Sequence, residues 1–148
     1  MCYLEGTGVK KDVKEAVRLF RKGDELGVHS CITYLGLCNL EGVGVDENPK
    51  EAVKLFRKAA DLGGTTAMNM LARCYIDGMG VDADTKEAVK WYRKAAELDS
   101  VPAMVNLGVC YLEGTGVDKD RKEAARWFRK AAERGSKQAK ELLKSLTD

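Results

Sequence analysis

Four short glycine loops recur along the chain at a constant spacing of 36 residues. Each loop has the sequence Gly-x-Gly-Val, and the copies begin at Gly6, Gly42, Gly78 and Gly114. A sequence period of about 20 to 50 residues is typical of stacked repeat proteins, in which each unit buries its apolar side only against its neighbours. The spacing therefore predicts an array of similar units rather than one independent globular core.

Each loop is followed by the start signal of a helix, which we name helix B. An Asp or Asn stands three residues before a Glu, as in Asp120 and Glu123. In such a capping box, the first side chain accepts from the amides of the first turn and the Glu reaches back. Pro49 falls at the first helical position, where no amide donor is needed. Together with an apolar stripe at helical spacing, these signals predict helix B at residues 13–26, 49–62, 85–98 and 121–134.

A second helix of each unit, helix A, is predicted at residues 29–41, 65–77 and 101–113. Gly36 and Gly108 fall in the middle of it. Glycine there costs about 1 kcal/mol relative to alanine, which makes sense only if another helix crosses closely. The prediction is an all-α fold, a right-handed α/α superhelix, or solenoid, of antiparallel helix pairs with a 36-residue period.

We expect one repeat array over residues 1–148. It would consist of a truncated first repeat, three full repeats and a C-terminal capping helix, at residues 1–27, 28–63, 64–99, 100–135 and 136–148. The chain starts inside a predicted helix A, so the first complete helix lacks its usual neighbour. Exposed apolar surface at that end predicts end-to-end self-association.

Composition and charge exclude two classes of partner. The 25 Lys and Arg stand against 23 Asp and Glu, a net charge of +2. This is far from the excess that drives binding to phosphate backbones by counterion release. No run of about 18 apolar residues exists, so no helix could span a membrane. We therefore expect neither a nucleic-acid partner nor a membrane partner.

The five cysteines do not form an obvious disulfide framework. Cys2, Cys38, Cys74 and Cys110 fall at the same position of successive repeats. Equivalent stacked helices lie about 8–10 Å apart, whereas a disulfide requires Cα atoms within about 7 Å. We expect small, reduced packing residues and a reducing, cytoplasmic compartment.

Catalysis, metal binding and cofactor binding find no support in the motifs. The chain has a single histidine, His29, and no Gly-x-Ser-x-Gly element. The Gly-x-Gly loops lack the third glycine of a dinucleotide-binding loop, and the element before them is helical rather than a strand. We expect no enzyme activity, no cofactor and no metal.

The repeating residues resemble the Sel1-like repeat family, a relative of the tetratricopeptide repeat. The matching residues of the last unit are Ala103, Leu107-Gly108, Tyr111, Gly114, Gly116-Val117, Asp120, Glu123-Ala124, Trp127-Phe128 and Lys130-Ala131-Ala132. The resemblance implies a helical solenoid that acts as an adaptor between proteins, with helices A lining its concave side. A secreted, cysteine-rich branch of the family joins its helices through a Cys pair at positions matching Asp24 and Cys31. Only Cys31 is present, which disfavours that branch and the β-lactamase-like activity associated with it.

Positions that differ between repeats are the candidates for ligand contact, because the shared positions build the unit itself. On the predicted concave face of helix A these are Thr33, Leu37, Glu41, Asn69, Arg73, Asp77, Val105, Val109 and Glu113. Apolar side chains beside an arginine and an acidic row suit an extended or helical peptide, and arginine is frequent in binding hot spots. Alternatively, the aliphatic members only pack against the next helix.

The sequence thus predicts a scaffold or adaptor that binds a protein or peptide on the helix A face, with Arg73 as the main polar anchor. Two alternatives stay open. The copies resemble one another closely enough for an engineered or consensus-like scaffold with no natural ligand. The chain could also be a fragment of a larger multidomain protein.

Overall fold

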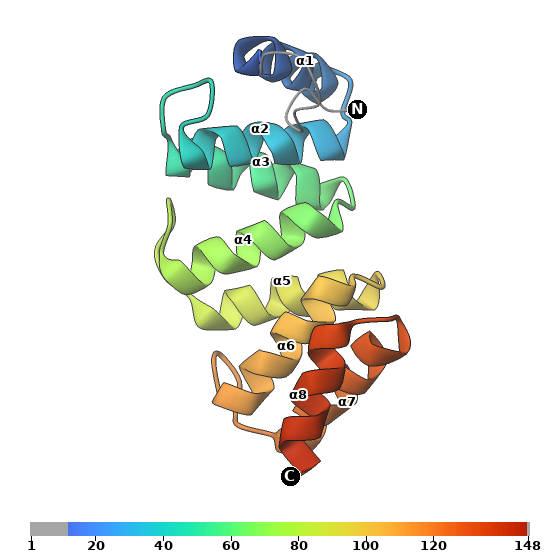
Figure 1. Cartoon of the computed structure of the whole chain (residues 1–148). Coiled ribbons are helices and arrows are strands. Elements are labelled where there is room, and N and C mark those ends of the chain that lie inside the picture. Colours follow the sequence, from blue (N-terminus) through green and yellow to red (C-terminus); the bar gives the residue numbers. More distant parts are fainter. Residues whose placement is uncertain (1–11, 148) are drawn as a thin grey trace. The chain divides into compact units, whose positions relative to one another are not determined.

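The computed structural model describes residues 12–147, and this part of the chain is all α-helical (Figure 1). Consecutive helices run in opposite directions and form sequential antiparallel pairs, so the fold is an α-solenoid built from 36-residue repeats. The eight helices within the described range are α1 (Val13–Glu25), α2 (His29–Glu41), α3 (Pro49–Asp61), α4 (Thr65–Asp77), α5 (Thr85–Glu97), α6 (Val101–Glu113), α7 (Arg121–Glu133) and α8 (Lys137–Thr147).

The predicted helix positions are confirmed, with a small correction to helices B. Helices A appear as α2, α4 and α6 at the predicted residues. Helices B appear as α1, α3, α5 and α7, and each ends one residue earlier than predicted. The residue that follows is the C-cap, which is Leu26, Leu62, Leu98 or Arg134.

The predicted capping boxes are confirmed for the Asp and Asn side chains and corrected for the Glu side chains. The side chains of Asp12, Asn48, Asp84 and Asp120 accept hydrogen bonds from the backbone N–H three residues on, at 3.0–3.1 Å. The Glu side chains do not complete the box, because each pairs instead with the Arg or Lys three residues later, as in Lys90 with Glu87 at 2.9 Å. The N–H groups of Asp84 and Asp120 donate to the carbonyls of Tyr75 and Tyr111 near the end of the preceding helix A.

The reversal after each helix B uses the left-handed backbone conformation. Gly27, Gly63 and Gly135 have φ of 70°, 87° and 92°. Asp99 stands at the equivalent position with φ of 64°, and it is the one non-glycine residue with positive φ in the described range. The side chain of Asp99 pairs with Arg134.

The Gly-x-Gly loops are structural turns that tuck against the start of an earlier helix B. Gly116 has φ of 70°, and a Cβ there would lie 2.1 Å from the carbonyl oxygen of Thr85. Gly80 has the same relation to the carbonyl oxygen of Pro49, at 2.2 Å. Only glycine allows both the backbone conformation and this approach, so packing accounts for the motif.

Mid-helix glycines mark the places where helices A and B cross, as predicted. A Cβ at Gly36 would lie 2.6 Å from Cε1 of Phe56, whose side chain is completely buried. The same relation recurs in the last repeat. Large residues on helix B thus pack directly on the backbone of helix A.

Backbone contacts divide the chain into two compact units. Unit 1 comprises Met1–Ala67 with Met79–Val81, and in it α1 packs on α2 and α2 on α3. Unit 2 comprises Met68–Gly78 with Asp82–Asp148, and in it α5 packs on α6, α6 on α7, and α7 on α8. The predictions of a single array and of a right-handed superhelix stay predictions. The Gly6 loop, Cys2, the truncated start of the first repeat and the self-associating N-terminal end lie outside the described residues.

Candidate functional site

The first candidate site is a small pocket in unit 2 between α4 and α6. It has a volume of about 140 Å³ and is lined by Ile76, Tyr92, Asn106, Val109, Cys110, Glu113 and Thr115. Val109 and Ile76 are half-buried, so their apolar side chains are partly open to solvent. Val109 and Glu113 were predicted as contact residues, and the pocket brings them together.

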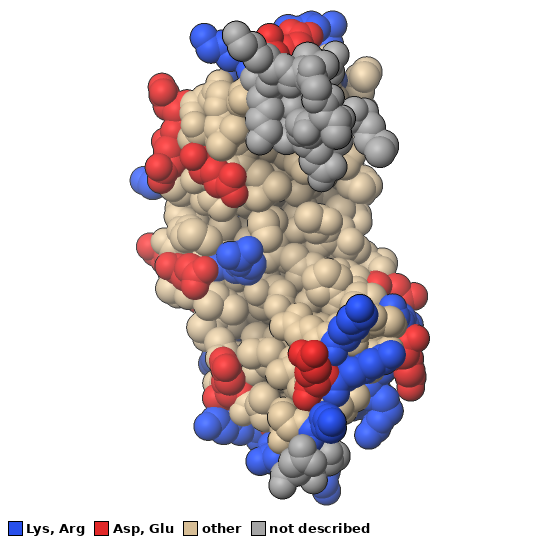
Figure 2. Space-filling view, in the orientation of Figure 1, with Lys and Arg blue, Asp and Glu red and all other residues tan. Residues whose placement is uncertain are grey.

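One charged residue, Glu113, lines this pocket, and two others, Arg73 and Asp77, act electrostatically on its lining residue Tyr92. Arg73 and Asp77 lie on α4 on either side of Ile76 along the helix, and both are exposed, as is Glu113 on α6. Figure 2 shows acidic side chains gathered over the C-terminal ends of α4 and α6. The pocket therefore has one carboxylate in its lining, with the cation of Arg73 and the carboxylate of Asp77 nearby on α4.

The electrostatics of Tyr92 show that the charges on α4 reach the pocket. The pKa of Tyr92 is raised to about 12, mainly by burial and also by the neighbouring Cys110, while Arg73 opposes the rise. Asp77 adds to the rise. A charged group of a ligand in this pocket would thus interact with Arg73 and Asp77.

A chain of side-chain amides lies beside the same pocket. Nδ2 of Asn106 donates to Oδ1 of Asn69 at 3.5 Å, and Nδ2 of Asn69 donates to Oγ of Ser100 at 3.1 Å. Asn106 is half-buried, whereas Asn69 is buried. The amide of Asn106 is therefore held in place at the pocket wall, where it could hydrogen-bond to a peptide backbone.

Unit 1 contains a second small pocket of about 150 Å³ on the helix A side. It is lined by His29, Ser30, Thr33, Tyr34, Leu37, Thr65 and Thr66. The exposed Tyr34 ring stacks on Phe20, with ring centroids 5.3 Å apart. Leu37 is half-buried and Glu41 is exposed. Three of the predicted contact residues, Thr33, Leu37 and Glu41, lie on α2, and the first two of them line this pocket.

Three of the nine predicted contact residues lie beneath the surface rather than on it. Thr33, Asn69 and Val105 are only 4–6% exposed. The hydroxyl of Thr33 donates to the carbonyl of His29 at 2.7 Å, and Asn69 bonds to Ser100. Their side chains are short and satisfied internally, which is why this position of helix A tolerates Thr, Asn or Val in the interior.

Other lining residues were missed. Tyr34 and Asn106 occupy the same position of two repeats, where the intervening repeat has Met70. That position varies as much as those that were predicted, so the same criterion of variation between repeats could have identified it. Thr115 lies inside the loop between its two glycines, at a position where other repeats have Val43 and Met79, so it varies between repeats as well.

The cysteines are free, in agreement with the expectation for those that the structure describes. Cys31, Cys38, Cys74 and Cys110 form no disulfide. Burial raises the pKa of Cys110 to about 11, with Glu113 contributing, and burial also raises the pKa of Cys74. These thiols stay protonated at neutral pH and act as apolar packing groups, because the thiolate is the reactive form.

An open depression of about 930 Å³ lies beside α3 in unit 1. Its lining includes Lys50, Lys54, Arg57 and Lys58 as well as Asp24 and Asp61. Lys58 pairs with Asp24 and Lys54 with Glu51. Internal ion pairs thus occupy much of this basic surface, which agrees with a solvated outer face. Between residues 12 and 147 no group of His, Cys, Asp and Glu could hold a metal ion, and no helix is long and apolar enough to cross a membrane.

The chain is similar to several solved structures, among them the following three. A Sel1 repeat protein from Oxalobacter formigenes is 35% identical with a TM-score of 0.88, covering 95% of this chain and 58% of that one. The protective antigen c5321 of uropathogenic Escherichia coli, which displays an SLR fold, is 36% identical with a TM-score of 0.85, covering 93% and 29%. The Helicobacter pylori cysteine rich protein B is 29% identical with a TM-score of 0.72, covering 94% and 100%.

The chain therefore spans about three fifths of the Oxalobacter formigenes protein and less than a third of the Escherichia coli antigen. No curated protein sequence matches it. The Sel1 repeat model matches residues 1–28, 29–64, 65–100 and 101–136, which is most of the chain. This repeat forms a fold that is generally used for protein–protein interaction. The chain belongs to the Sel1 repeat family.

Proposed function

We propose that this chain is an adaptor that holds a peptide segment of a partner protein on its helix A side, at the pocket between α4 and α6. The observation that carries this proposal is the combination of two half-buried apolar side chains in the lining, Val109 and Ile76, with the exposed Arg73, whose charge acts on the lining residue Tyr92. Binding hot spots commonly combine such apolar anchors with arginine.

Each part of the pocket has a defined role in this proposal. One aliphatic side chain of the partner enters the pocket against Val109. Arg73 binds a carboxylate or a backbone carbonyl of the same segment, since a guanidinium presents several donors in a fixed fork. Asn106, whose amide is held by Asn69, bonds to the peptide backbone.

The α2 pocket in unit 1 gives a second contact area for the same kind of ligand. The exposed ring of Tyr34 and the half-buried side chain of Leu37 supply apolar surface there. A rigid aromatic side chain costs little conformational entropy when it is ordered on binding, which favours Tyr34 as a contact residue.

We also infer that the protein works in a reducing compartment such as the cytoplasm. The support is that four cysteines are free and that the thiol groups of Cys74 and Cys110 are protonated packing groups. No residue in the proposed contact area requires an oxidising environment.

Reversing the charge at Arg73 tests the proposal. Peptides are selected on the native chain from a random display library, and their Kd is measured by calorimetry for the native chain, Arg73→Glu and Arg129→Glu. Arg129 is a matched control because it is exposed on α7 of the same unit, away from the pocket. We expect Arg73→Glu to weaken binding by about tenfold or more, as for a hot-spot arginine, without a change in Tm beyond a degree or two. Equal Kd values for Arg73→Glu and the native chain would rule out the α4–α6 pocket as the binding site.

A further inference from the structure

Positive charge is concentrated at the C-terminal end of unit 2. Residues 118–148 contain 10 of the 25 Lys and Arg but only 6 of the 23 Asp and Glu, a local net charge of +4. Residues 1–117 carry a net charge of −2. Figure 2 shows Lys and Arg side chains gathered over α8 and the neighbouring part of α7.

Many cations in this region are already engaged by other side chains. Arg126 pairs with Glu123 at 3.4 Å, and Arg134 pairs with Asp99. The ammonium of Lys130 lies over the Trp127 ring, 4.5 Å from its centroid. Among the cations that these contacts do not engage, Lys137 and Lys140 lie together on α8.

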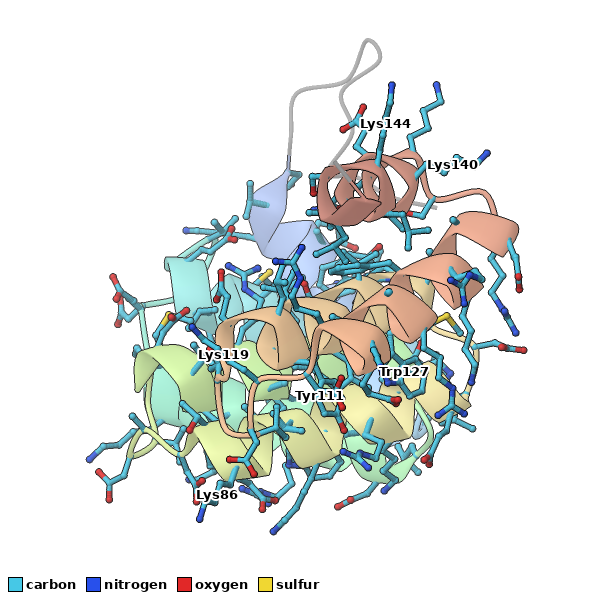
Figure 3. The ribbon with its side chains drawn as sticks, turned by 90° about the horizontal axis from the view of Figure 1, so that it is seen from below. Lys86, Tyr111, Lys119, Trp127, Lys140 and Lys144 are labelled. Atoms are coloured by element: carbon cyan, nitrogen blue, oxygen red, sulfur yellow. The ribbon has the colours of Figure 1, made fainter. Side chains whose placement is uncertain are left out.

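Two lysines of α8 stand at repeat positions where α6 has buried residues. Lys140 and Lys144 stand one repeat after Met104 and Gly108 of α6. Met104 is 1% exposed, and Gly108 lies against the ring of Phe128. Lys140 and Lys144 are exposed instead, and Figure 3 shows both side chains pointing away from the ribbon of α8. This face of α8 therefore does not carry the residues with which α6 packs against α7.

Lys137 lies on the same side of α8, so the three lysines form a row about 10 Å long at the helical rise. Arg121 lies at the C-terminal end of α8, because its guanidinium donates to the carbonyl of Leu146 at 3.3 Å. We name Lys137, Lys140, Lys144 and Arg121 the C-terminal basic surface. Within residues 12–147, Lys137 and Lys140 have no carboxylate at ion-pair distance.

Charge complementarity identifies the chemistry of a partner for this surface. A second copy of the chain does not fit through α1, because its exposed side carries Lys14, Arg18, Arg21 and Lys22. A membrane surface does not fit well either, because the apolar side of α8 is turned inward, with Ala139 completely buried. A row only about 10 Å long contacts few phosphates of a nucleic acid, whose binding depends on neutralising many.

We propose that the C-terminal basic surface binds an acidic segment of a partner protein, independently of the α4–α6 pocket. Asp or Glu side chains of that segment pair with Lys137 and Lys140. Contacts of this kind raise the association rate and orient the partner more than they raise affinity. Binding should therefore weaken as salt is added, since exposed charges are screened beyond about 8 Å at physiological ionic strength.

The test uses a fluorescein-labelled peptide of eight glutamates and anisotropy measured at low and at physiological salt. The variant is Lys137→Glu with Lys140→Glu. The matched control is Lys14→Glu with Lys22→Glu, which changes the net charge equally on exposed lysines of α1. Circular dichroism melts establish that both variants fold. Arg73→Glu is measured in parallel, so that failure of this surface can be told apart from failure of the α4–α6 pocket.

We expect the α8 variant to bind the peptide at least about fivefold more weakly than the native chain, while the α1 control and Arg73→Glu bind as the native chain does. Equal loss in the α8 variant and the α1 control would overturn the proposal, because the effect would then come from net charge alone. Loss in Arg73→Glu alone would place the acidic segment in the pocket. Tighter, α8-dependent binding to a single-stranded oligonucleotide, or to vesicles containing phosphatidylserine, would overturn it in favour of that partner.

Discussion

The ring of Phe128 occupies the space that a side chain at Gly108 would need. A Cβ at position 108 would lie 2.5 Å from Cε1 of Phe128, and both residues are in the buried contact between α6 and α7. The glycine is thus required by the approach of α7.

The substitution Gly108→Ala should therefore destabilise the protein, although alanine is the better helix former by about 1 kcal/mol. We expect a loss of about 1–3 kcal/mol in the free energy of unfolding, because the added methyl overpacks the contact. Urea denaturation measures this. In a Phe128→Leu background the cost should fall, and an unchanged cost in that double-mutant cycle would show that Phe128 is not the obstacle.

Leu107 tests the neighbouring core position. Its side chain is completely buried, so Leu107→Ala should lower the free energy of unfolding by about 2–5 kcal/mol through lost burial and the cavity left behind. Leu98→Ala is the control, because Leu98 is 53% exposed and its loss should cost no more than about 0.5 kcal/mol. Similar melting curves for the two variants would contradict the assignment of Leu107 to the core.

Asp99 tests the turn after α5. A left-handed backbone costs L residues about 1–2 kcal/mol, whereas the exposed pair with Arg134 contributes about 0–1 kcal/mol. Asp99→Gly should therefore raise stability slightly, by up to about 1 kcal/mol. Asp99→Ala keeps the unfavourable φ and loses the pair, so it should lower the Tm. The opposite order of the two Tm values would show that the ion pair matters more than the backbone.

Tyr92 and Cys110 predict a loss of stability in alkali. Burial raises the pKa of Tyr92 from 10.0 to about 12 and that of Cys110 from 9.0 to about 11. A group whose pKa is raised on folding contributes stability that is fully present below its unfolded pKa and is lost as pH rises through its folded pKa. Stability should therefore decline from about pH 9 towards pH 12.

Tyr92→Phe isolates the contribution of one of these groups. Phenylalanine occupies the same repeat position at Phe56 and Phe128, both completely buried, so the variant should match the native chain at pH 7 within about 1 kcal/mol. Urea midpoints measured between pH 7 and pH 11 should fall less steeply for Tyr92→Phe than for the native chain. Parallel curves would mean that Tyr92 ionises as freely in the folded protein as in the unfolded one.

The helices could be predicted from the sequence because each local signal is repeated and consistent. In a stacked helical array, each of these signals has one structural role: Asp120 caps a helix, Gly36 allows a helix crossing, and Gly114 allows a chain reversal. Asp99 could be assigned to a glycine position only because three other repeats place glycine there. Repetition thus supplies internal comparisons that a single domain lacks.

The candidate site could be predicted only in part, because variation between repeats does not distinguish surface from interior. Thr33, Asn69 and Val105 differ in polarity, yet all are buried, since hydrogen bonds within the protein satisfy the polar ones. Asn106 of α6 is held at the pocket by a side-chain hydrogen bond to Asn69 of α4, and the repeat pattern does not show such a bond between two helices. The partners of the capping Glu residues, by contrast, are the Arg or Lys three residues later on the same helix, a spacing that is visible in the sequence.

The position of a bound peptide tests the central claim most directly. Amide chemical shifts of the 15N-labelled native chain are recorded while a library-selected peptide is added. The account predicts that the largest changes fall on Arg73, Ile76, Asn106, Val109 and Glu113, around the α4–α6 pocket. Changes confined to exposed residues of α5 and α7, such as Arg93 and Arg129, with these five residues unaffected, would contradict it.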